Sequence, residues 1–398
     1  MLPQDWLQRP LGDIAQITSG GTPDRSTPSY WGGDIPWLTT GEIQFNIITD
    51  SAEKITELGL KNSSAKLFPP GTLLMAMYGQ GKTRGQIAKL GIEATTNQAC
   101  AAILFDKKND PDFYFQYLAS KYEDLRELGN AGTQKNLNGG ILKRILVPVP
   151  PVHEQRRIAH ILSTWDQAIA TAEQQLTSSR RYAEVLRSAL LSGQRRFGDY
   201  APWQSKPLSK MIRESRVTGS GGDVAKKITV KLYGRGVVGK SDKRAGSEST
   251  RYYRRSAGQF IYSKLDFLNG AFGRIPAALD GYESTLDLPA FDFLPGIDPR
   301  WFLHYVSREA FYAGHLGLAN GGRKARRVNP NDLLRVSIPT PCLEEQARIA
   351  DAIDTALSLV TTQEKLLKLL RQEKSALMTQ LLTGKRRVRL PSDKADPT

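Results

Sequence analysis

The feature that most constrains this sequence is an internal repeat. Residues 147–159, VPVPPVHEQRRIA, return as residues 338–350, IPTPCLEEQARIA, after a shift of 191 positions without a gap. The same shift relates Ser192–Arg196 (SGQRR) to Thr383–Arg387 (TGKRR) at the far end of each copy. The chain is therefore a tandem of two halves that share one kind of connector.

Each connector begins with two prolines and continues as a long helix. In the first copy, apolar residues recur in steps of four and three, which is the pattern of a coiled-coil seam. Gly193 stands where such a helix would end. The predicted helix-pair core is Ile158, Leu162, Trp165, Ile169, Leu176, Leu186 and Leu190 in the first copy, and Ile349, Ile353, Val360, Leu367, Leu370, Leu377 and Leu381 in the second.

Two helices of about 40 residues, each about 60 Å long, need a partner for so narrow an apolar stripe. Each helix is the nearest candidate partner for the other. The alternative is that each stripe packs on its own globule, but a stripe of this length exceeds what one small domain covers.

The segments outside the helices indicate mixed α/β globules. Before the first helix, Ile35–Leu38, Leu73–Tyr78 and Ala101–Phe105 have the composition of strands bounded by turns, and the apolar spacing over Pro111–Leu128 is typical of a helix. The second globule begins like the first, since Trp203–Leu208 repeats the Trp-x-x-x-Pro-Leu pattern of Trp6–Leu11. Beyond these ends the two globules diverge.

The predicted fold class is therefore α+β, with two mixed α/β globules joined by two long helices in a tandem repeat. The predicted boundaries are residues 1–147 for the first globule, 148–196 for the first helical connector, 197–338 for the second globule, 339–384 for the second connector and 385–398 for a basic, polar tail.

Composition excludes several classes of protein. At 398 residues the chain is too long for one ordinary core, and 40% hydrophobic with 24% charged residues is typical of globular proteins. Cys100 and Cys342 lie far apart without a Cys-x-x-Cys spacing, which argues against a disulfide framework or a zinc ribbon. No run of about 18 apolar residues and no signal-peptide pattern occur, so we expect a cytoplasmic protein without membrane association.

The strongest match to a catalytic motif is misleading. Gly234–Ser241, GRGVVGKS, satisfies the phosphate-loop pattern and follows a plausible strand at Ile228–Tyr233. Both the phosphate-loop and the dinucleotide pattern require a helix directly afterwards, but Asp242–Thr250 has too few apolar residues to bury a helix face. We therefore favour a glycine-rich turn over nucleotide binding. The four histidines show no metal-ligand spacing, and no catalytic or metal-binding residues are expected.

Positive charge is the feature that points to a partner. The formal net charge is +15, and residues 202–266 hold 15 Lys and Arg against 5 Asp and Glu, interleaved with tyrosines. A basic or amide-rich loop precedes each connector, at 134–136 and at 323–327, and glycines flank both loops. A solvated basic face is the simpler explanation. The repeated basic loops and the global charge nevertheless favour nucleic acid as the partner.

At this point the chain resembles the specificity subunit of type I DNA restriction-modification systems, from about Trp6 to Arg387. The segments that carry the resemblance are Pro10–Ile14, Gly20–Pro23, Tyr30–Trp31, Ile35–Trp37, Met77–Gly79, Thr95–Cys100, the repeated Glu-Gln-x-Arg-Ile-Ala entries at 154–159 and 345–350, Gly258–Lys264 and Asn269–Gly273. Each segment alone is a weak signal, but their order within a tandem repeat is specific.

The resemblance implies a pseudo-two-fold subunit in which the helices form an antiparallel coiled coil and the two globules are target recognition domains. Each domain would read one half of a split duplex DNA target, and the helices would set the gap. The subunit would be non-catalytic and would recruit two modification (methyltransferase) subunits and motor-nuclease restriction subunits. S-adenosylmethionine, ATP and Mg would act on those partners, with no cofactor in this chain.

We expect loop residues with basic or amide side chains to contact DNA. In the first domain these are Arg25, Gln80, Lys82, Arg84, Lys135 and Asn136. In the second they are Arg235, Lys240, Arg251, Arg254, Arg255, Lys324, Arg326 and Arg327.

Two alternatives stay open at this stage: a nucleotide-binding protein that uses Gly234–Ser241, and a basic coiled-coil scaffold for RNA or membranes. The repeated acid-amide pairs Glu154-Gln155 and Glu345-Gln346 are candidates for helix support or for docking of partner subunits. We favour helix support, because acids near a helix start are stabilising on local grounds alone.

Overall fold

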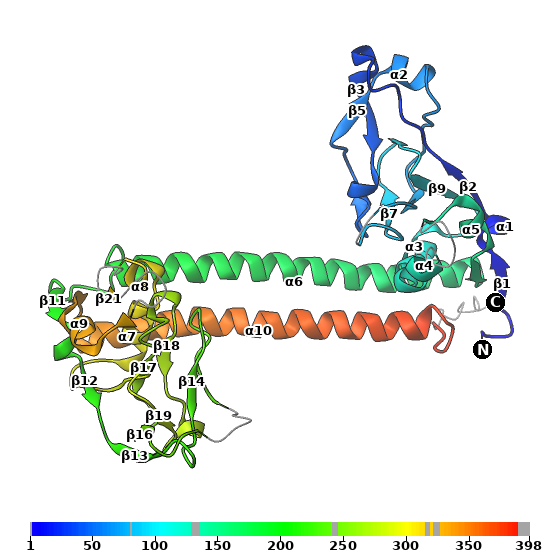
Figure 1. The fold of residues 1–398 in the computed structure, drawn as a ribbon. Helices are drawn as coiled ribbons and strands as arrows, with labels where there is room; N and C mark the ends of the chain where they lie inside the picture. Colours follow the sequence, from blue (N-terminus) through cyan, green and yellow to red (C-terminus); the bar gives the residue numbers. More distant parts are fainter. Residues whose placement is uncertain are drawn as a thin grey trace, which may run out of the picture. The chain divides into compact units, whose positions relative to one another are not determined.

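A computed structural model describes residues 2–79, 82–128, 136–240, 246–314, 319–320 and 327–388. The chain divides into two compact units. Unit 1 consists of Met1–Gln174 with Lys365–Thr398, and unit 2 consists of Gln175–Glu364. Each unit therefore holds one globule together with a segment of each long helix (Figure 1).

Unit 1 is a mixed α/β globule packed on helix segments. Its strands are β1 (Leu7–Pro10), β2 (Ala15–Ser19), β3 (Trp31–Leu38), β4 (Ile47–Ile48), β5 (Glu53–Ile55), β6 (Leu73–Ala76), β7 (Ile87–Leu90), β8 (Thr95–Thr96), β9 (Cys100–Phe105) and β10 (Leu146–Val149). Its helices are α1 (Leu11–Ile14), α2 (Glu57–Lys61), α3 (Pro111–Ser120), α4 (Tyr122–Leu128), α5 (Gly139–Arg144), the first part of α6 (Val152–Ser192) and the last part of α10 (Leu343–Leu381).

The main sheet of unit 1 has five strands in the order β2-β9-β6-β7-β4, and a three-stranded sheet follows the order β5-β3-β8. Strand β1 pairs antiparallel with β10 and so joins the start of the globule to the helix entry. Ile158 and Leu162 of α6 and Leu381 of α10 share one buried cluster with this globule. Each such fully buried side chain contributes about 2 kcal/mol through removal of apolar surface from water.

The helix that the sequence predicts over Pro111–Leu128 is in fact two helices. α3 ends at Ser120 and α4 begins at Tyr122, because Lys121 between them has φ of −99° and ψ of 12°, outside helical geometry. Asp110 caps α3 by accepting hydrogen bonds from the N–H groups of Asp112 and Phe113.

Unit 2 repeats the plan with different elements. Its strands are β11 (Gln204–Pro207), β12 (Ile212–Ser215), β13 (Thr218–Gly221), β14 (Ile228–Val230), β15 (Val237–Gly239), β16 (Arg251–Arg254), β17 (Phe260–Tyr262), β18 (Phe272–Arg274), β19 (Glu283–Ser284), β20 (Ala290–Phe293), β21 (Ala319–Asn320), β22 (Arg327–Val328) and β23 (Ser337–Thr340). Its helices are α7 (Pro299–Val306), α8 (Glu309–Tyr312), α9 (Pro330–Arg335) and the remaining parts of α6 and α10.

The pairing of β11 with β23 in unit 2 is the counterpart of β1 with β10 in unit 1, but the rest of the sheet topology differs. Unit 2 has a four-stranded sheet in the order β12-β20-β17-β18, a three-stranded sheet β13-β16-β19 and a separate two-stranded ribbon of β14 and β15. Leu190 of α6 and Ile349 and Ile353 of α10 complete its aromatic-rich core. The structure thus confirms that similar connectors carry two globules of different sheet topology.

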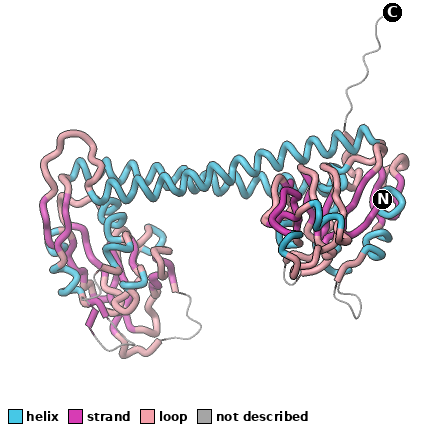
Figure 2. The backbone as a smooth tube through the Cα atoms, turned by 90° about the horizontal axis from the view of Figure 1, so that it is seen from above, coloured by secondary structure: helices cyan, strands magenta, loops and turns pink. Residues whose placement is uncertain are grey.

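The two long helices run antiparallel within each unit. In unit 1, Asp166 and Glu173 of α6 pair with Lys374 and Arg371 of α10, in reverse order along the chain. In unit 2, Arg180 of α6 pairs with Glu364 of α10. Figures 1 and 2 both show the two helix segments side by side in each unit. The predicted antiparallel coiled coil and α+β class are therefore confirmed.

The helix ends follow the chemistry of the repeat. Gly193 and Gly384, directly or soon after the two helices, have φ of 77° and 68°. This left-handed conformation terminates a helix and suits glycine, which has no Cβ.

Candidate nucleic-acid interface

In each unit, a buried glutamate at the start of a long helix accepts hydrogen bonds from a tryptophan and an arginine. We call this set of contacts the clasp, because it joins the globule to the helix. In unit 1, Glu154 accepts hydrogen bonds from the indole N–H of Trp6 at 3.0 Å and from Nε and Nη2 of Arg387 at 2.8 and 2.9 Å. The Glu154 residue is only 3% exposed. The same guanidinium also pairs with Asp5, and this contact lowers the pKa of the Asp5 carboxyl.

Unit 2 contains the same clasp. Glu345, which is fully buried, accepts a hydrogen bond from the indole N–H of Trp203 at 2.9 Å and from Nε and Nη2 of Arg196 at 2.9 and 2.8 Å. In both units the tryptophan lies at the start of a globule, and the glutamate lies in the first turn of the long helix that follows that globule. The arginine comes from the end of the other copy.

The glutamine next to each glutamate links the start of the long helix to a helix of the globule, α3 in unit 1 and α7 in unit 2. The side-chain oxygen of Gln155 accepts from the N–H of Asp110, just before α3, and its amide donates to the carbonyl of Pro150. In unit 2, the side-chain oxygen of Gln346 accepts from the N–H of Asp298, just before α7, and its amide donates to the carbonyl of Pro341.

These contacts correct the interpretation of the acid-amide pairs as local helix support. All four side chains are buried, and they bond to groups outside the first turn of their own helices. Docking of partner subunits on these side chains is excluded by the same burial. Their role is to join globule and helix.

The predicted helix-pair core residues differ in their surroundings, since Ile158, Leu162 and Leu381 lie in the buried cluster of the first globule and Leu190, Ile349 and Ile353 in that of the second. Ile158, Leu162, Leu176, Leu190, Ile349, Ile353, Leu367 and Leu381 are buried, and Trp165, Ile169, Leu186, Val360, Leu370 and Leu377 are partly buried. By contrast, Tyr182 and Val185, which lie off the seam, are 58% and 61% exposed. Lys374, a polar exception within the seam, is accommodated by its ion pair with Asp166.

A polar hollow of about 560 Å³ marks one face of unit 1. Three segments that are distant in sequence line it: the end of β2, the loop after β6 with Tyr78, and the start of α5 with Asn138 and Lys143. Gln98, which lies just before β9, is exposed beside them and accepts a hydrogen bond from Thr22. The hollow thus gathers amide, hydroxyl and ammonium groups of the kinds that contact phosphates and base edges.

The predicted DNA-contact residues of unit 1 differ in their accessibility. Lys82 and Asn136 are exposed. Arg84 is half-buried and donates to the carbonyl of Arg126. Arg25 is bound bidentately by Glu53 at 2.7 Å and lies 3.9 Å from the Trp31 ring centroid. Gln80 and Lys135 lie outside the described residues.

In unit 2 the predicted contacts separate into exposed and buried residues. Arg235, Lys240, Arg251, Arg254 and Arg327 are exposed. Lys324 and Arg326 lie outside the described residues.

Arg255 requires a correction, because it is only 1% exposed. Its guanidinium donates to the hydroxyl of Ser284 and to the carbonyls of Ser215 and Leu288. Burial lowers the pKa of Arg255 to about 10, partly offset by the charge of Glu214. Arg255 therefore bridges β12, β16 and the β19–β20 connection from inside and is removed from the proposed DNA surface.

The interpretation of Gly234–Ser241 as a phosphate loop is wrong. Val237–Gly239 forms β15 and pairs antiparallel with Ile228–Val230 of β14, so Gly234 and Gly236 belong to a hairpin turn. Residues 237–239 form an extended paired strand where the pattern requires an open loop around the phosphate, and Ser241 lies outside the described residues.

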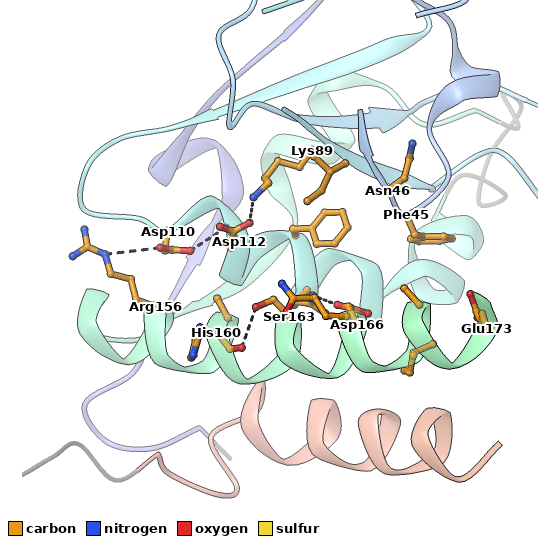
Figure 3. A pocket seen from close by; sticks show the side chains of 17 residues that line it. Phe45, Asn46, Lys89, Asp110, Asp112, Arg156, His160, Ser163, Asp166 and Glu173 are labelled. Atoms are coloured by element: carbon orange, nitrogen blue, oxygen red, sulfur yellow. Dashed lines mark hydrogen bonds and ion pairs between the residues drawn. The ribbon is translucent and has the colours of Figure 1, made fainter. Parts of the chain in front are cut away.

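A cavity of about 630 Å³ lies between the globule of unit 1 and α6 (Figure 3). Several of its charged side chains have partners: Lys89 pairs with Asp112, while Asp166 and Glu173 pair with Lys374 and Arg371 of α10. Ser163 and His160 both line it, but the Ser163 hydroxyl donates to the backbone carbonyl of His160 rather than to its imidazole. In the described part of the chain, no group of three or more His, Cys, Asp or Glu side chains is arranged to hold a metal ion. Nor does any helix there have the length and apolarity to cross a membrane.

Comparison with known proteins gives these features a context. A family model described as the type I restriction modification DNA specificity domain matches residues 3–178. The MjaIX specificity subunit of Methanocaldococcus jannaschii is 32% identical over 180 residues, which are 44% of this chain and 41% of that protein. A putative MjaX specificity subunit from the same organism is 24% identical over 98% of this chain and 95% of its own length. The chain is thus similar to type I restriction specificity subunits, over residues 3–178 in the family model and over most of its length in MjaX.

The solved structures extend the likeness to the whole fold. The S subunit from M. genitalium has a TM-score of 0.57 at 13% identity, covering 96% of this chain and 97% of that one. The HsdS subunit from Thermoanaerobacter tengcongensis has a TM-score of 0.57 at 16% identity, covering 97% and 98%. At these identities the structures support the fold of this chain rather than its individual contacts. The match to MjaIX spans less than half of that relative.

The clasp residues are what sequence reasoning missed. Trp6, Glu154 and Arg387 each have a counterpart in the other copy, at Trp203, Glu345 and Arg196. The signal was therefore present as three matched polar or aromatic positions in an otherwise diverged repeat. Their meeting, across 148 and 233 positions in unit 1, was not deducible from spacing.

Proposed function

We propose that this chain is a specificity subunit that binds a bipartite duplex DNA target, with one half-site for each globule. The observation that carries the proposal is the identical mounting of two different globules. Each is clasped to its helix by the same Trp–Glu–Arg and Gln contacts, while the main sheets have five and four strands in different orders. Two globules that are attached to their helices in the same way, but have different surfaces, suit two different half-sites at a fixed separation.

In this proposal the helices set the separation, because α6 and α10 are unbroken over 41 and 39 residues. The chain itself performs no catalysis. It recruits two modification subunits, which hold S-adenosylmethionine and methylate adenine, and restriction subunits, which use ATP and Mg. Its place of action is then the cytoplasm, where the DNA of the cell lies.

The test begins with the complex of this chain and its modification subunits, and with a map of methylated adenines in DNA exposed to it. We expect a split motif with methylation on both strands and a constant gap. A heptad inserted after Gln174 in α6 and another after Glu364 in α10 lengthens the pair by about 10 Å without changing the seam register. At 3.4 Å per base pair, the gap grows by about three base pairs and both half-sites stay the same.

The matched control carries the insertion in α10 alone, which leaves the two helices unequal. This variant is expected to lose selective methylation, because one seam no longer matches the other. A continuous motif, or a gap that the double insertion does not lengthen, contradicts the proposal. Equal retention of duplex DNA and RNA by the wild-type complex contradicts it as well, and favours a general scaffold for polyanions.

A further inference from the structure

The β14–β15 hairpin of unit 2 has a fixed stem and an exposed tip. Its two strands pair over Ile228–Val230 and Val237–Gly239 as a ribbon separate from the larger sheets. Ile228, Val230 and Val237 are buried in one cluster with Ile261 and Ala290. The stem is therefore anchored by packing, and the segment between the strands projects from it.

The tip is held in an uncommon backbone conformation. Tyr233 has φ of 58°, in the left-handed region that side chains other than glycine rarely adopt. Two backbone hydrogen bonds fix it there: the N–H of Tyr233 donates to the carbonyl of Asn269 at 2.8 Å, and the N–H of Gly234 donates to that of Gly270 at 2.9 Å. Strain of this kind persists where the surrounding structure over-determines it, and it is concentrated at functional positions.

The side chains that this conformation presents are not used inside unit 2. Tyr233 is 69% exposed, and Arg235 is exposed with its guanidinium 6.0 Å from the Tyr233 ring centroid. Among the described residues, the Tyr233 hydroxyl and the Arg235 guanidinium form no hydrogen bond or ion pair. Other arginines of the unit are engaged, such as Arg216 with Glu214 and Arg300 with Asp298.

We infer that this tip reads base edges in one half-site: Arg235 donates to a guanine in the major groove, and the Tyr233 ring holds the guanidinium in place. The inference rests on the proposed DNA-reading function. A two-stranded β-ribbon fits the width of the major groove of B-form DNA. The planar guanidinium matches the O6 and N7 acceptors of guanine bidentately, and this is the commonest specific contact between proteins and DNA.

The rigidity of the tip distinguishes this role from a contact with phosphate. A phosphate is satisfied by any nearby positive charge on a flexible side chain, and such contacts carry no sequence information. A base edge is discriminated best by donors in a fixed planar fork, because two parallel hydrogen bonds add geometric specificity. Two backbone hydrogen bonds hold the tip at Tyr233 and Gly234, and the Tyr233 ring beside the Arg235 guanidinium orients its planar fork.

The experiment measures base preference at every position of the target for the full complex of this chain with its modification subunits, by selection from DNA with one randomised half-site at a time. Arg235→Ala is expected to lower the preference for one guanine roughly tenfold to a hundredfold in a single half-site, leaving the other unchanged. Arg235→Lys keeps the charge but not the planar fork, and is expected to lose most of the same preference. Tyr233→Gly accepts the left-handed backbone, so it keeps the fold while weakening the preference.

The matched control is Lys206→Ala, which removes one exposed positive charge from β11 in the same unit. It leaves the base preferences unchanged. If Arg235→Ala instead weakens binding to all sequences equally and reduces the salt dependence by about one phosphate contact, Arg235 binds phosphate and the inference is overturned. Unchanged binding and selectivity also overturn it. If the wild-type complex itself selects no sequence, the proposed function fails first, and that result is distinct from either outcome.

Discussion

Removal of the buried glutamate from one clasp tests whether that clasp stabilises its unit. In Glu345→Ala, the indole N–H of Trp203 and the guanidinium of Arg196 lose their shared acceptor, which is fully buried in the wild type. The Trp203 N–H then loses its acceptor, which costs about 1–3 kcal/mol, while the partly exposed guanidinium of Arg196 can be rehydrated. For a domain of 150–250 residues this lowers Tm by roughly 2–12 °C.

Two further variants are expected to lose less stability than Glu345→Ala. Glu344→Ala changes the neighbouring glutamate, which is exposed and accepts a single hydrogen bond from Tyr200, so about 0.5 kcal/mol or less is expected. Glu345→Gln keeps the shape and one acceptor for Trp203, but places an amide against Arg196. We expect an intermediate loss.

The assay is thermal unfolding with hydrogen exchange read separately for the two units. Glu345→Ala should increase exchange in unit 2 around β11, β23 and the start of α10, which are the elements the clasp joins. The reasoning is refuted if Glu345→Ala lowers Tm no more than Glu344→Ala does, or if exchange rises only in unit 1.

The other predictions concern pH, backbone geometry, capping and charge. Burial lowers the pKa of His304 despite the opposing effect of Asp354; the unfolded chain then binds more protons between that pKa and about 6.5, so unit 2 loses stability as pH falls through this range. Tm at about pH 7.5 and 5.5 should show this difference, and His304→Gln should reduce it; an unchanged difference would count against the assignment. Gly270→Ala adds a Cβ at φ of 69°, 3.3 Å from the Tyr233 Cα, and should destabilise the fold in urea by about 1–2 kcal/mol, whereas Gly139→Ala, with nothing within 4 Å, should be near neutral. Asp110→Ala removes the α3 cap and should cost about 1 kcal/mol by the same measurement; no loss would show that the Pro at the helix start suffices. Lys82→Ala should lower the salt slope of DNA binding by about one without altering the methylated motif, and a changed motif would instead make Lys82 a base reader.

Local patterns explain what the sequence predicted correctly. The helix seam was predictable because its period depends only on residues three and four apart, and the helix ends because prolines and Gly193 act locally. The hairpin at Gly234 was predictable as a turn because the following residues have too little apolar surface for a helix. The break at Lys121 was missed, since the apolar spacing continues across it.

Contacts between distant residues explain what it did not predict. The charge cluster that contains Arg255 has the composition of a solvated basic face, and nothing in the local sequence shows that its side chain turns inward to Ser215 and Ser284. The interpretation of Glu154 and Glu345 failed for the same reason. Their partners Arg387 and Arg196 lie in the opposite repeat copy, and only the folded structure brings them together.

The exchange of arginines between the repeat copies also determines the order in which the units are completed during synthesis. Unit 2 is one uninterrupted stretch, Gln175–Glu364, whereas unit 1 needs residues from both sides of it. The first globule emerges from the ribosome first, yet its core lacks Leu381 and its clasp lacks Arg387 until all of unit 2 has been translated. Until then the clasp of Glu154 and Trp6 lacks Arg387, which lies 233 positions after the glutamate. The globule that is translated first is thus completed last. A chain that ends before Arg387 is expected to have an incomplete unit 1 and a complete unit 2.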